Sequence, residues 1–314
     1  MATILDGRKL AEEIKTDVRK EVETLNKIGV DVGLALLLVG DNPATVQYFR
    51  ATLSACKKTG VTAYEFMLPS TVTLNEILNL VNKINIDERI HGLLVLMPLP
   101  GHMNARRIIN HIVPEKDIDG LGAISVGRLA ADESTFQLFK KGTADADQES
   151  RVIPSIWSFL PCTPFGVIRL LEHYRVQIRG RHAVIIGKSL AVGKPLSSMF
   201  LAKEATVTVC HRETANLTAM TKQADILCSA TGRAGLIKAG MVKKGAVVVD
   251  IGINVLKNGS ITGDVDFKSV SKKASLITPV PGGVGPVTIA MLLENTVRSA
   301  QRNELFKSPL ILMG

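Results

Sequence analysis

Apolar positions in the first part of the chain follow two different spacings. Across residues 8–28 they recur every three or four positions, which predicts an amphipathic helix. Residues 33–40 form a continuous apolar run bounded by glycines, which predicts a buried parallel strand. Residues 41–45 then predict a turn into a helix that is capped by Asp41 or Asn42 and ends near residue 60, a glycine.

The same alternation continues through the next segment. Residues 61–68 predict a strand, residues 74–87 a helix capped by Ser70 or Thr71, and residues 90–96 another strand. This order is typical of an α/β fold, in which ligands bind beyond the carboxyl ends of the strands. We therefore expect functional groups in three segments: residues 41–48, 96–100 and 116–120.

A second α/β unit begins near residue 163. Thr163 and Pro164 predict the cap and first position of a helix that runs to residue 174, because proline is favoured at a first helical position. Regularly spaced apolar runs then indicate the parallel strands of a Rossmann-type domain. These runs are residues 183–187, 205–210, 224–230 and 246–252.

These patterns predict a two-domain α/β chain. We expect a first domain over residues 1–146, completed by a C-terminal helix at 287–314, and a Rossmann-type domain over residues 147–286. Residues 130–158 break the alternation, since they are mixed and polar and contain acidic residues at 145, 147 and 149. They predict an inserted loop that shapes substrate entry, mediates oligomerisation or has no chemical role.

The composition indicates a globular protein with anionic ligands. Of the 314 residues, 46% are hydrophobic, and no apolar run reaches the roughly 18 residues of a membrane span. The net charge of +9 comes from scattered Lys and Arg with only 4% aromatic residues, which favours an anionic small molecule over nucleic acid. Four dispersed cysteines and an N-terminus without an export signal favour a cytoplasmic protein with no metal site.

Residues 278–288 form the most unusual stretch of the chain. Three prolines and three glycines occur there, between an apolar run and a helical segment predicted at residues 289–299. Proline fixes φ and glycine lets a ligand approach the backbone, so this stretch predicts a rigid wall of a binding site. Thr288 is placed to cap the helix that follows. The alternative is a tight turn between a strand and a helix.

A glycine-containing turn follows the strand predicted at residues 183–187. Gly187 and Gly193 flank the turn, and the next helix offers free N–H groups and a favourable dipole to a pyrophosphate. The literal GxGxxG sequence is absent from the turn. The pattern alone therefore leaves dinucleotide binding open.

Three motifs together resemble one known family. They are Gly-Lys-Ser-x-x-Val-Gly-x-Pro at residues 187–195, Lys-Asp-x-Asp-Gly at residues 116–120, and the proline-glycine loop at residues 278–288. In this form they resemble the methylenetetrahydrofolate dehydrogenase/cyclohydrolase family (the FolD family), with similarity over nearly the whole chain. The resemblance implies an oxidoreductase of one-carbon metabolism, with folate in a cleft between the two domains and a homodimer formed through the second.

The resemblance also implies roles on the folate side. Asp119 is expected to anchor the pterin, because a carboxylate accepts paired hydrogen bonds from an aminopyrimidinone ring; the alternative is a turn residue. Tyr48 matches an aromatic residue near the p-aminobenzoate ring and the nicotinamide, and Thr45 takes the place of a usual serine. The same site is expected to be lined by Pro281, Gly282 and Gly283.

On the cofactor side the expected ligand is NADP, with NAD as the alternative. Arg212 and Lys188 are cations placed to meet a 2′-phosphate, where NAD-preferring sites usually have an acidic residue. The alternative is two solvated surface charges, and Glu213 could weaken the effect of Arg212. The expected cofactor contacts are Gly187, Lys188, Ser189, Val192, Gly193, Pro195, His211, Arg212, Thr231, Gly232 and Ile253.

Two positions at the expected chemical centre depart from the family pattern. Thr52 stands where the resemblance implies a lysine, and Leu96 stands where it implies a glutamine; Ser125 also replaces an asparagine on the folate side. Hydride transfer needs mainly positioned ligands, whereas hydrolysis of the methenyl product needs an activated water, for which a lysine matters most.

We therefore predict a methylenetetrahydrofolate dehydrogenase with weak or absent cyclohydrolase activity. Its expected catalytic residues are Tyr48, Thr52 and Asp119, and Leu96 is expected to line the folate. Three alternatives stay open at this point: a bifunctional dehydrogenase/cyclohydrolase, a catalytically silent folate- or nucleotide-binding homologue, and an enzyme for a different pterin.

Overall fold

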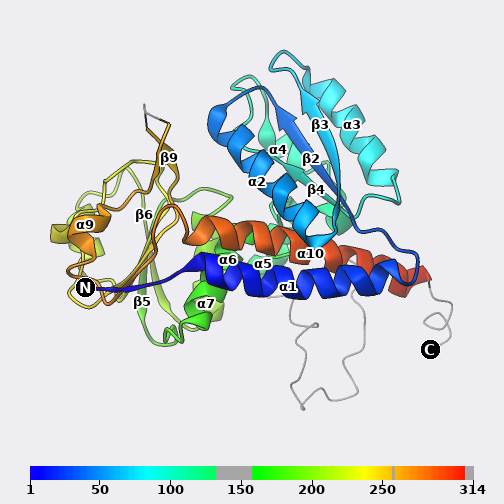
Figure 1. Ribbon diagram of the computed structural model, residues 1–314. Coiled ribbons are helices and arrows are strands. Elements are labelled where there is room, and N and C mark those ends of the chain that lie inside the picture. The colour runs from blue at the N-terminus through cyan, green and yellow to red at the C-terminus, as the bar shows by residue number, and fades with distance from the viewer. Residues whose placement is uncertain (132–157, 257–258, 308–314) are drawn as a thin grey trace. The chain divides into compact units, whose positions relative to one another are not determined.

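The computed structural model describes residues 1–131, 158–256 and 259–307 (Figure 1). Contacts within the chain group it into two compact units. One consists of Met1–Lys15 and Cys162–Met291, and the other of Thr16–Pro161 and Leu292–Gly314. We call them the six-stranded unit and the three-stranded unit after their main sheets.

The three-stranded unit is built on a parallel sheet in the order β3-β2-β4. Every residue of the central strand β2 (Gly33–Val39) is buried, as its continuous apolar run predicted. β3 (Thr62–Leu68) and β4 (Gly92–Val95) pair with it on either side, so all three carboxyl ends lie at one edge. The helical segments are α2 (Pro43–Thr59), α3 (Leu74–Ile86), α4 (Ala105–Ile109), η1 (Pro114–Lys116) and α5 (Ala123–Ala130).

The ends of α2 follow the prediction, and the start of α3 does not. The Asn42 side chain caps α2 by accepting hydrogen bonds from backbone N–H groups, and Gly60 ends the helix in a left-handed conformation with φ of 79°. α3 is capped by Thr73, which forms a reciprocal capping box with Glu76. The predicted caps, Ser70 and Thr71, were wrong, because α3 begins at Leu74 and the residue directly before it is Thr73.

The six-stranded unit is built on a parallel sheet in the order β6-β5-β7-β8-β11-β1. The chain passes from β5 to β6 on one side and then crosses to β7 on the other. Such a switch point opens a crevice at the carboxyl ends of the two strands that flank it. The strands are β1 (Thr3–Ile4), β5 (His182–Ile186), β6 (Thr206–Cys210), β7 (Ile226–Ser229), β8 (Val247–Asp250) and β11 (Leu276–Ile277).

The first residues of the chain belong to this second sheet. β1 pairs with β11, so that Thr3 lies opposite Leu276 and Ile4 opposite Ile277. Residues 1–15 therefore group with the Rossmann-type sheet, whereas the sequence assigned them to the first domain. A two-residue strand has too little periodicity to be recognised locally. The expected boundary at 146/147 and most of the expected loop at 130–158 lie outside the described residues.

The remaining elements of the six-stranded unit connect its strands. β9 (Asn254–Val255) and β10 (Ile261–Thr262) form an antiparallel hairpin, which carries the β9 label in Figure 1. The helical segments are α6 (Cys162–His173), α7 (Gly193–Ala202), α8 (Leu217–Thr221), η4 (Ala239–Met241) and α9 (Phe267–Val270).

Two long helices contribute residues to both units. α1 (Gly7–Asn26) confirms the first predicted helix. α10 (Val284–Lys307) begins inside the proline-glycine loop, before the predicted start at 289, because a proline at 286 is tolerated in a first helical turn. Thr288 therefore lies within α10, and Thr163 lies within α6. Both predicted caps were wrong.

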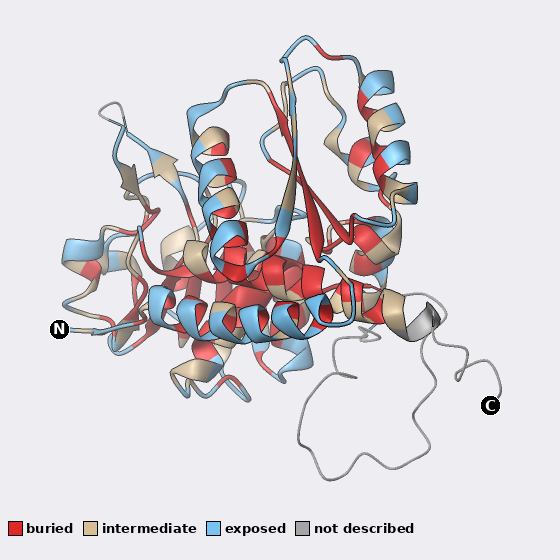
Figure 2. Cartoon of the chain, turned by 45° about the vertical axis from the view of Figure 1, so that its right-hand side comes forward, coloured by how far each residue is buried: buried red, intermediate tan, exposed pale blue. Residues whose placement is uncertain are grey.

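Buried residues are concentrated in the central strands, such as β2 and β8, and on one face of most helices (Figure 2). In the six-stranded unit Val184, Leu227 and Val248 belong to one core cluster. In the three-stranded unit a second cluster includes Leu37 of β2 and Ile77 of α3. Each sheet therefore has its own packed core.

Two negative observations apply to the residues that the structure describes. None of their helices has the length and apolarity needed to cross a membrane. They also contain no group of three or more His, Cys, Asp or Glu side chains that could hold a metal ion. The four cysteines, all in this part of the chain, are buried thiols, and burial raises the pKa of Cys56 to about 12.

Candidate functional site

The carboxyl edge of the three-stranded sheet brings two predicted folate-side segments together. α2 follows the central strand, and Leu96 follows β4, the strand beside it. The Thr45 hydroxyl on α2 lies 3.4 Å from the carbonyl oxygen of Met97. The turn at the start of α2 and the segment after β4 are therefore in direct contact, as the α/β pattern predicted.

Tyr48 and Thr52 share one face of α2, because they are four residues apart. The Thr52 hydroxyl donates a hydrogen bond of 2.9 Å to the Tyr48 carbonyl oxygen. Thr52 is 0% exposed and Leu96 is 1% exposed. The hydroxyl is thus satisfied by its own helix and Leu96 has no polar group, so neither side chain offers a base or a cation.

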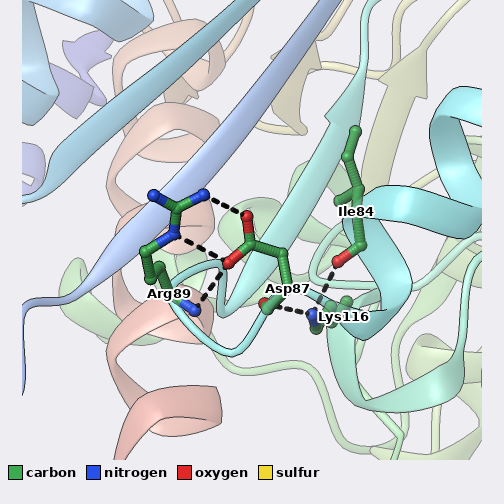
Figure 3. Close-up of polar contacts among 4 residues, drawn as sticks. All are labelled: Ile84, Asp87, Arg89 and Lys116. Atoms are coloured by element: carbon green, nitrogen blue, oxygen red, sulfur yellow. Dashed lines mark hydrogen bonds and ion pairs between the residues drawn. The ribbon is translucent and has the colours of Figure 1, made fainter.

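The side-chain amine of Lys116, in the Lys-Asp-x-Asp-Gly motif, is engaged in hydrogen bonds within the fold. Its Nζ donates to the carbonyl oxygens of Ile84 (2.7 Å) and Asp87 (2.8 Å) at the end of α3 (Figure 3). Burial lowers the pKa of the amine. The Asp87 carboxylate binds the Arg89 guanidinium, whose hydrogen bonds lower the pKa of Asp87 to about 2. Lys116 therefore satisfies the last carbonyls of a helix.

Replacing this lysine should destabilise the protein. Lys116→Met is expected to lower the free energy of unfolding by about 1–3 kcal/mol, because two carbonyl oxygens lose a charged donor. Chemical denaturation measures the change. Lys83→Met is the matched control, since Lys83 is an exposed lysine of α3, the helix whose last carbonyl groups Lys116 binds. An equal loss of unfolding free energy in the two variants would contradict the structural role of Lys116 at the end of α3.

Asp117 organises the turn that carries Asp119. Its carboxylate accepts hydrogen bonds from the Ser125 hydroxyl (2.6 Å) and from the backbone N–H groups of Leu121 (3.1 Å) and Gly122 (2.9 Å). Burial raises the pKa of Asp117 to about 6. Ser125 therefore supports this buried turn, and its expected place on the folate side stays a prediction. Asp119 is half-buried, and its role as pterin anchor stays a prediction.

The raised pKa of Asp117 predicts a pH-dependent stability. The folded state binds this proton more tightly than the unfolded state, whose pKa is near 3.8. Its contribution is therefore complete below 3.8 and is lost as the pH rises toward about 6. Across this pH window the free energy of unfolding of the unmodified chain is expected to fall by about 1–3 kcal/mol more than that of Asp117→Asn. Urea unfolding at several pH values in this window measures the difference. The prediction is contradicted if the free energy of unfolding varies with pH equally in the variant and in the unmodified chain. Asp250, whose pKa is also about 6, retains its own contribution.

The predicted cofactor turn lies at the switch point of the six-stranded sheet. Gly187 follows β5 with φ of 119°, and its N–H donates to the Cys210 carbonyl oxygen at the end of β6. A Cβ atom on Gly193 would overlap the Gly187 carbonyl oxygen, so the start of α7 packs directly on the turn. The side chains of Lys188 and Ser189 are exposed beside it. This is the geometry in which a helix N-terminus binds a pyrophosphate.

The other predicted cofactor residues occupy neighbouring turns. Thr231 and Gly232 follow β7, which also flanks the switch point, and Ile253 precedes β9 with 57% of its surface exposed. Arg212 follows β6 and pairs with the exposed Glu213 at 2.9 Å. An exposed pair of this kind stabilises by only about 0–1 kcal/mol, so a phosphate can compete for Arg212. The preference for a 2′-phosphate stays a prediction.

The loop at residues 279–283 lies against the start of α1. The Gly7 N–H donates to the Gly282 carbonyl oxygen at 3.0 Å. Gly282 has φ of 114°, and a Cβ atom on it would lie 3.0 Å from the Arg8 guanidinium carbon. The sequence pattern did not indicate this contact of Gly7 and Arg8, because it joins segments far apart in the chain. The placement of Pro281, Gly282 and Gly283 in a ligand site stays a prediction.

Sequence reasoning also missed two buried carboxylates. Asp250 ends β8, and Asp264 follows β10, beside the turn that carries Thr231. No local pattern indicated them, because their surroundings come from other segments: a Cβ atom on Gly252 would overlap Asp264, and one on Gly263 would overlap Asp250.

A cavity of about 380 Å³ lies at the opposite, amino-terminal edge of the six-stranded sheet. Its polar lining includes Arg175, Arg181, Asp225, Lys243 and Lys244. None of the predicted site residues lines it. The predicted cofactor residues instead surround the carboxyl edge, where open parallel sheets bind ligands.

The sequence matches a protein family along most of its length. Residues 5–119 match the catalytic domain of tetrahydrofolate dehydrogenase/cyclohydrolase, and residues 161–304 match its NAD(P)-binding domain. This chain belongs to that family. The expected resemblance is thereby confirmed, together with the expected α/β architecture of a catalytic domain and a Rossmann-like NAD(P)-binding domain.

Individual relatives cover nearly the whole chain. The bifunctional protein FolD of Campylobacter jejuni is 45% identical over 299 residues, 95% of this chain and 98% of that protein. The bifunctional protein FolD of Bacillus subtilis is 43% identical over 301 residues, 96% of this chain and 98% of that protein.

Solved structures of relatives have the same fold. The Campylobacter jejuni enzyme superposes with a TM-score of 0.86 at 44% identity, covering 96% of this chain and 100% of that one. A 5,10-methylenetetrahydrofolate dehydrogenase from the silkworm Bombyx mori gives 0.84 at 37% identity, covering 97% and 100%. The Trypanosoma brucei dehydrogenase-cyclohydrolase, in complex with NADP and an inhibitor, gives 0.86 at 32% identity, covering 96% and 98%.

Proposed function

We propose that this chain oxidises 5,10-methylenetetrahydrofolate to 5,10-methenyltetrahydrofolate with NADP, as a step of one-carbon metabolism. The observation that carries the proposal is the contact of Gly193 with Gly187 at the switch point of a parallel sheet. It leaves the N-terminus of α7 open to a pyrophosphate in a domain of the NAD(P)-binding family. The NADP complex of the Trypanosoma brucei relative supports this cofactor over NAD.

The reaction needs positioned ligands more than acid–base groups. When bound, oxidised NADP takes up the hydride that leaves the methylene carbon of the folate. The lone pair of the adjacent folate nitrogen stabilises the resulting cation, so no proton has to be removed in this step. In our proposal Asp119 binds the pterin ring, Tyr48 lies beside the p-aminobenzoate ring, and the backbone of residues 281–283 contacts the ligands.

We further propose that the cyclohydrolase activity of this chain is weak. Hydrolysis requires an activated water, and a general acid–base group contributes about 10²–10⁴ in rate. Thr52 is buried with its hydroxyl donated to a backbone carbonyl, and Leu96 is apolar and buried. Lys57 and Lys58 are exposed in the last turn of α2 and do not replace the missing amine.

The second candidate function is a bifunctional dehydrogenase/cyclohydrolase. The family match and the bifunctional relatives at 43–45% identity favour it. Those relatives support the first activity equally well, so the two candidates differ only in hydrolysis. In the bifunctional case a group other than Thr52 and Leu96 would activate the water.

A paired assay on the purified protein separates the candidates. It follows NADP reduction with methylenetetrahydrofolate and, separately, the decay of methenyltetrahydrofolate above its spontaneous rate. Reduction without accelerated decay supports the dehydrogenase, and both signals support the bifunctional enzyme. Ligand binding with neither signal indicates a silent folate- or nucleotide-binding homologue. If NADP is reduced only when another pterin replaces the tetrahydrofolate compound, the chain uses a different pterin as its one-carbon carrier.

We also propose that the protein acts as a homodimer in the cytoplasm. The dimer rests on the family resemblance, and the compartment on the four buried thiols, which suit a reducing environment. Light scattering of the eluting protein during size-exclusion chromatography tests the first point, since a monomeric mass at assay concentration would refute it.

A further inference from the structure

Two buried carboxylates lie at the carboxyl edge of the six-stranded sheet and have no place in the proposed reaction. Asp264 is 0% exposed and Asp250 is 4% exposed. The Asp250 carboxylate accepts hydrogen bonds from the backbone N–H groups of Asp264 and Val265, both at 2.9 Å. Asp250 thereby fixes the backbone conformation at Asp264 and Val265.

Asp264 accepts hydrogen bonds from five donors. Its Oδ2 accepts from the Ser229 hydroxyl (3.0 Å) and from both the N–H (2.6 Å) and the hydroxyl (2.9 Å) of Thr231. Its Oδ1 accepts from the Arg233 N–H (2.9 Å) and the Asn254 amide (3.1 Å). An ionised carboxylate accepts hydrogen bonds only, and here each oxygen faces donors.

The backbone around these carboxylates leaves no room for other side chains. A Cβ atom on Gly252 would overlap the carboxylate of Asp264, and one on Gly263 would overlap that of Asp250. Burying a carboxylate costs free energy unless hydrogen bonds replace its lost hydration, and the five donors around Asp264 supply them.

The five donors come from two turns that carry predicted cofactor contacts. Ser229, Thr231 and Arg233 belong to the end of β7 and its following turn, which flanks the switch point. Asn254 begins β9 directly after Ile253. Asp264 is thus the common acceptor that ties the turn after β7 to the base of the β9–β10 hairpin.

We propose that Asp264 is a positioning residue for the dinucleotide: it holds the turn at Thr231 and the backbone at Ile253 in the conformation that binds NADP. It acts through these turns and does not itself touch the cofactor. The inference rests on the proposed NADP function of this domain, and it adds a residue that no local pattern indicated.

Asp264→Asn should weaken NADP binding. An amide in place of the carboxylate turns one acceptor oxygen into a donor that faces donors, so at least two of the five hydrogen bonds are lost. We expect the Kd for NADP, measured by binding, to rise about 10-fold or more. The kcat at saturating NADP and the KM for folate should change by less than about threefold, since the chemical step does not involve Asp264.

Two further variants make the test specific. Asn254→Ala removes one donor from a half-buried hairpin residue and leaves the carboxylate, so it should fold and raise the Kd for NADP by about 3-fold. Asp225→Asn is the matched control. Asp225 precedes β7 at the opposite edge of the same sheet, where it accepts from the His182 N–H at 3.0 Å and from Lys243, and it should leave the Kd unchanged.

Weaker NADP binding in Asp264→Asn and Asn254→Ala, with none in Asp225→Asn, would support the proposal. If Asp264→Asn does not fold, the Kd of Asn254→Ala decides. NADP affinities equal to that of the unmodified protein, even with a lower Tm, would overturn it and leave a purely structural carboxylate. If the unmodified protein itself does not bind NADP, the proposed function fails as well, which distinguishes the two failures.

Discussion

The double variant Thr52→Lys with Leu96→Gln is expected to hydrolyse methenyltetrahydrofolate about 10²–10⁴ times faster than the unmodified chain. The lysine would restore an amine four residues after Tyr48, on the same face of α2. The glutamine would restore an amide that hydrogen-bonds this amine and helps to set its protonation state. NADP reduction should change far less, because hydride transfer removes no proton.

The control for this gain is Thr52→Met with Leu96→Gln. Methionine has a chain of comparable length without an amine, so this variant should hydrolyse no faster than the unmodified chain. Decay of the methenyl compound, followed optically on protein of verified fold and folate affinity, gives the rates. The proposal of weak cyclohydrolase activity fails if the unmodified chain already hydrolyses efficiently, or if the folded lysine variant binds folate and shows no gain.

Gly193→Ala is expected to have the largest negative effect on cofactor binding. The new methyl group would overlap the Gly187 carbonyl oxygen and lie 3.0 Å from the Lys188 Cα atom. Both neighbours are backbone atoms, so the turn and the first N–H groups of α7 have to move. An overpacking strain of about 1–3 kcal/mol corresponds to a loss of about 5–150-fold in NADP affinity if the strain is relieved by moving the turn.

Gly240→Ala is the matched control for this glycine. It lies in η4 of the same unit, and a Cβ atom there would have no neighbour within 4 Å. Titration of NADP by fluorescence, together with thermal unfolding, compares the two variants. Unchanged NADP affinity in Gly193→Ala would remove the cofactor turn from its proposed place, whereas an equal loss in Gly240→Ala would indicate a general effect on folding.

Most of the regular elements followed from local patterns. The buried strand β2, the amphipathic helix α1 and the caps of α2 depend on the spacing of apolar side chains and on residues such as Asn42 and Gly60. Such signals lie within one element, so the chain carries them whatever surrounds it. The motifs at residues 116–120, 187–195 and 278–288 identified the family in the same local way.

Helix starts were predicted less well, because several caps compete locally. Thr73 was passed over although a glutamate follows three residues later, and Thr163 and Thr288 turned out to lie inside helices that begin earlier. In these cases the choice depends on which backbone N–H groups remain unsatisfied, and that depends on packing.

Contacts between distant segments required the tertiary structure. The pairing of β1 with β11 places the first residues in the Rossmann-like sheet, and Asp264 collects donors that include Ser229, 35 residues away. The hydrogen bonds of Lys116 with Ile84 and Asp87 are of the same kind, since they join residues 32 and 29 positions apart. Spacing along the chain was sufficient for most of the regular elements, and the resemblance of three motifs indicated the family. The acceptor for each donor, and the space beside each glycine, depend on which segments meet when the chain folds.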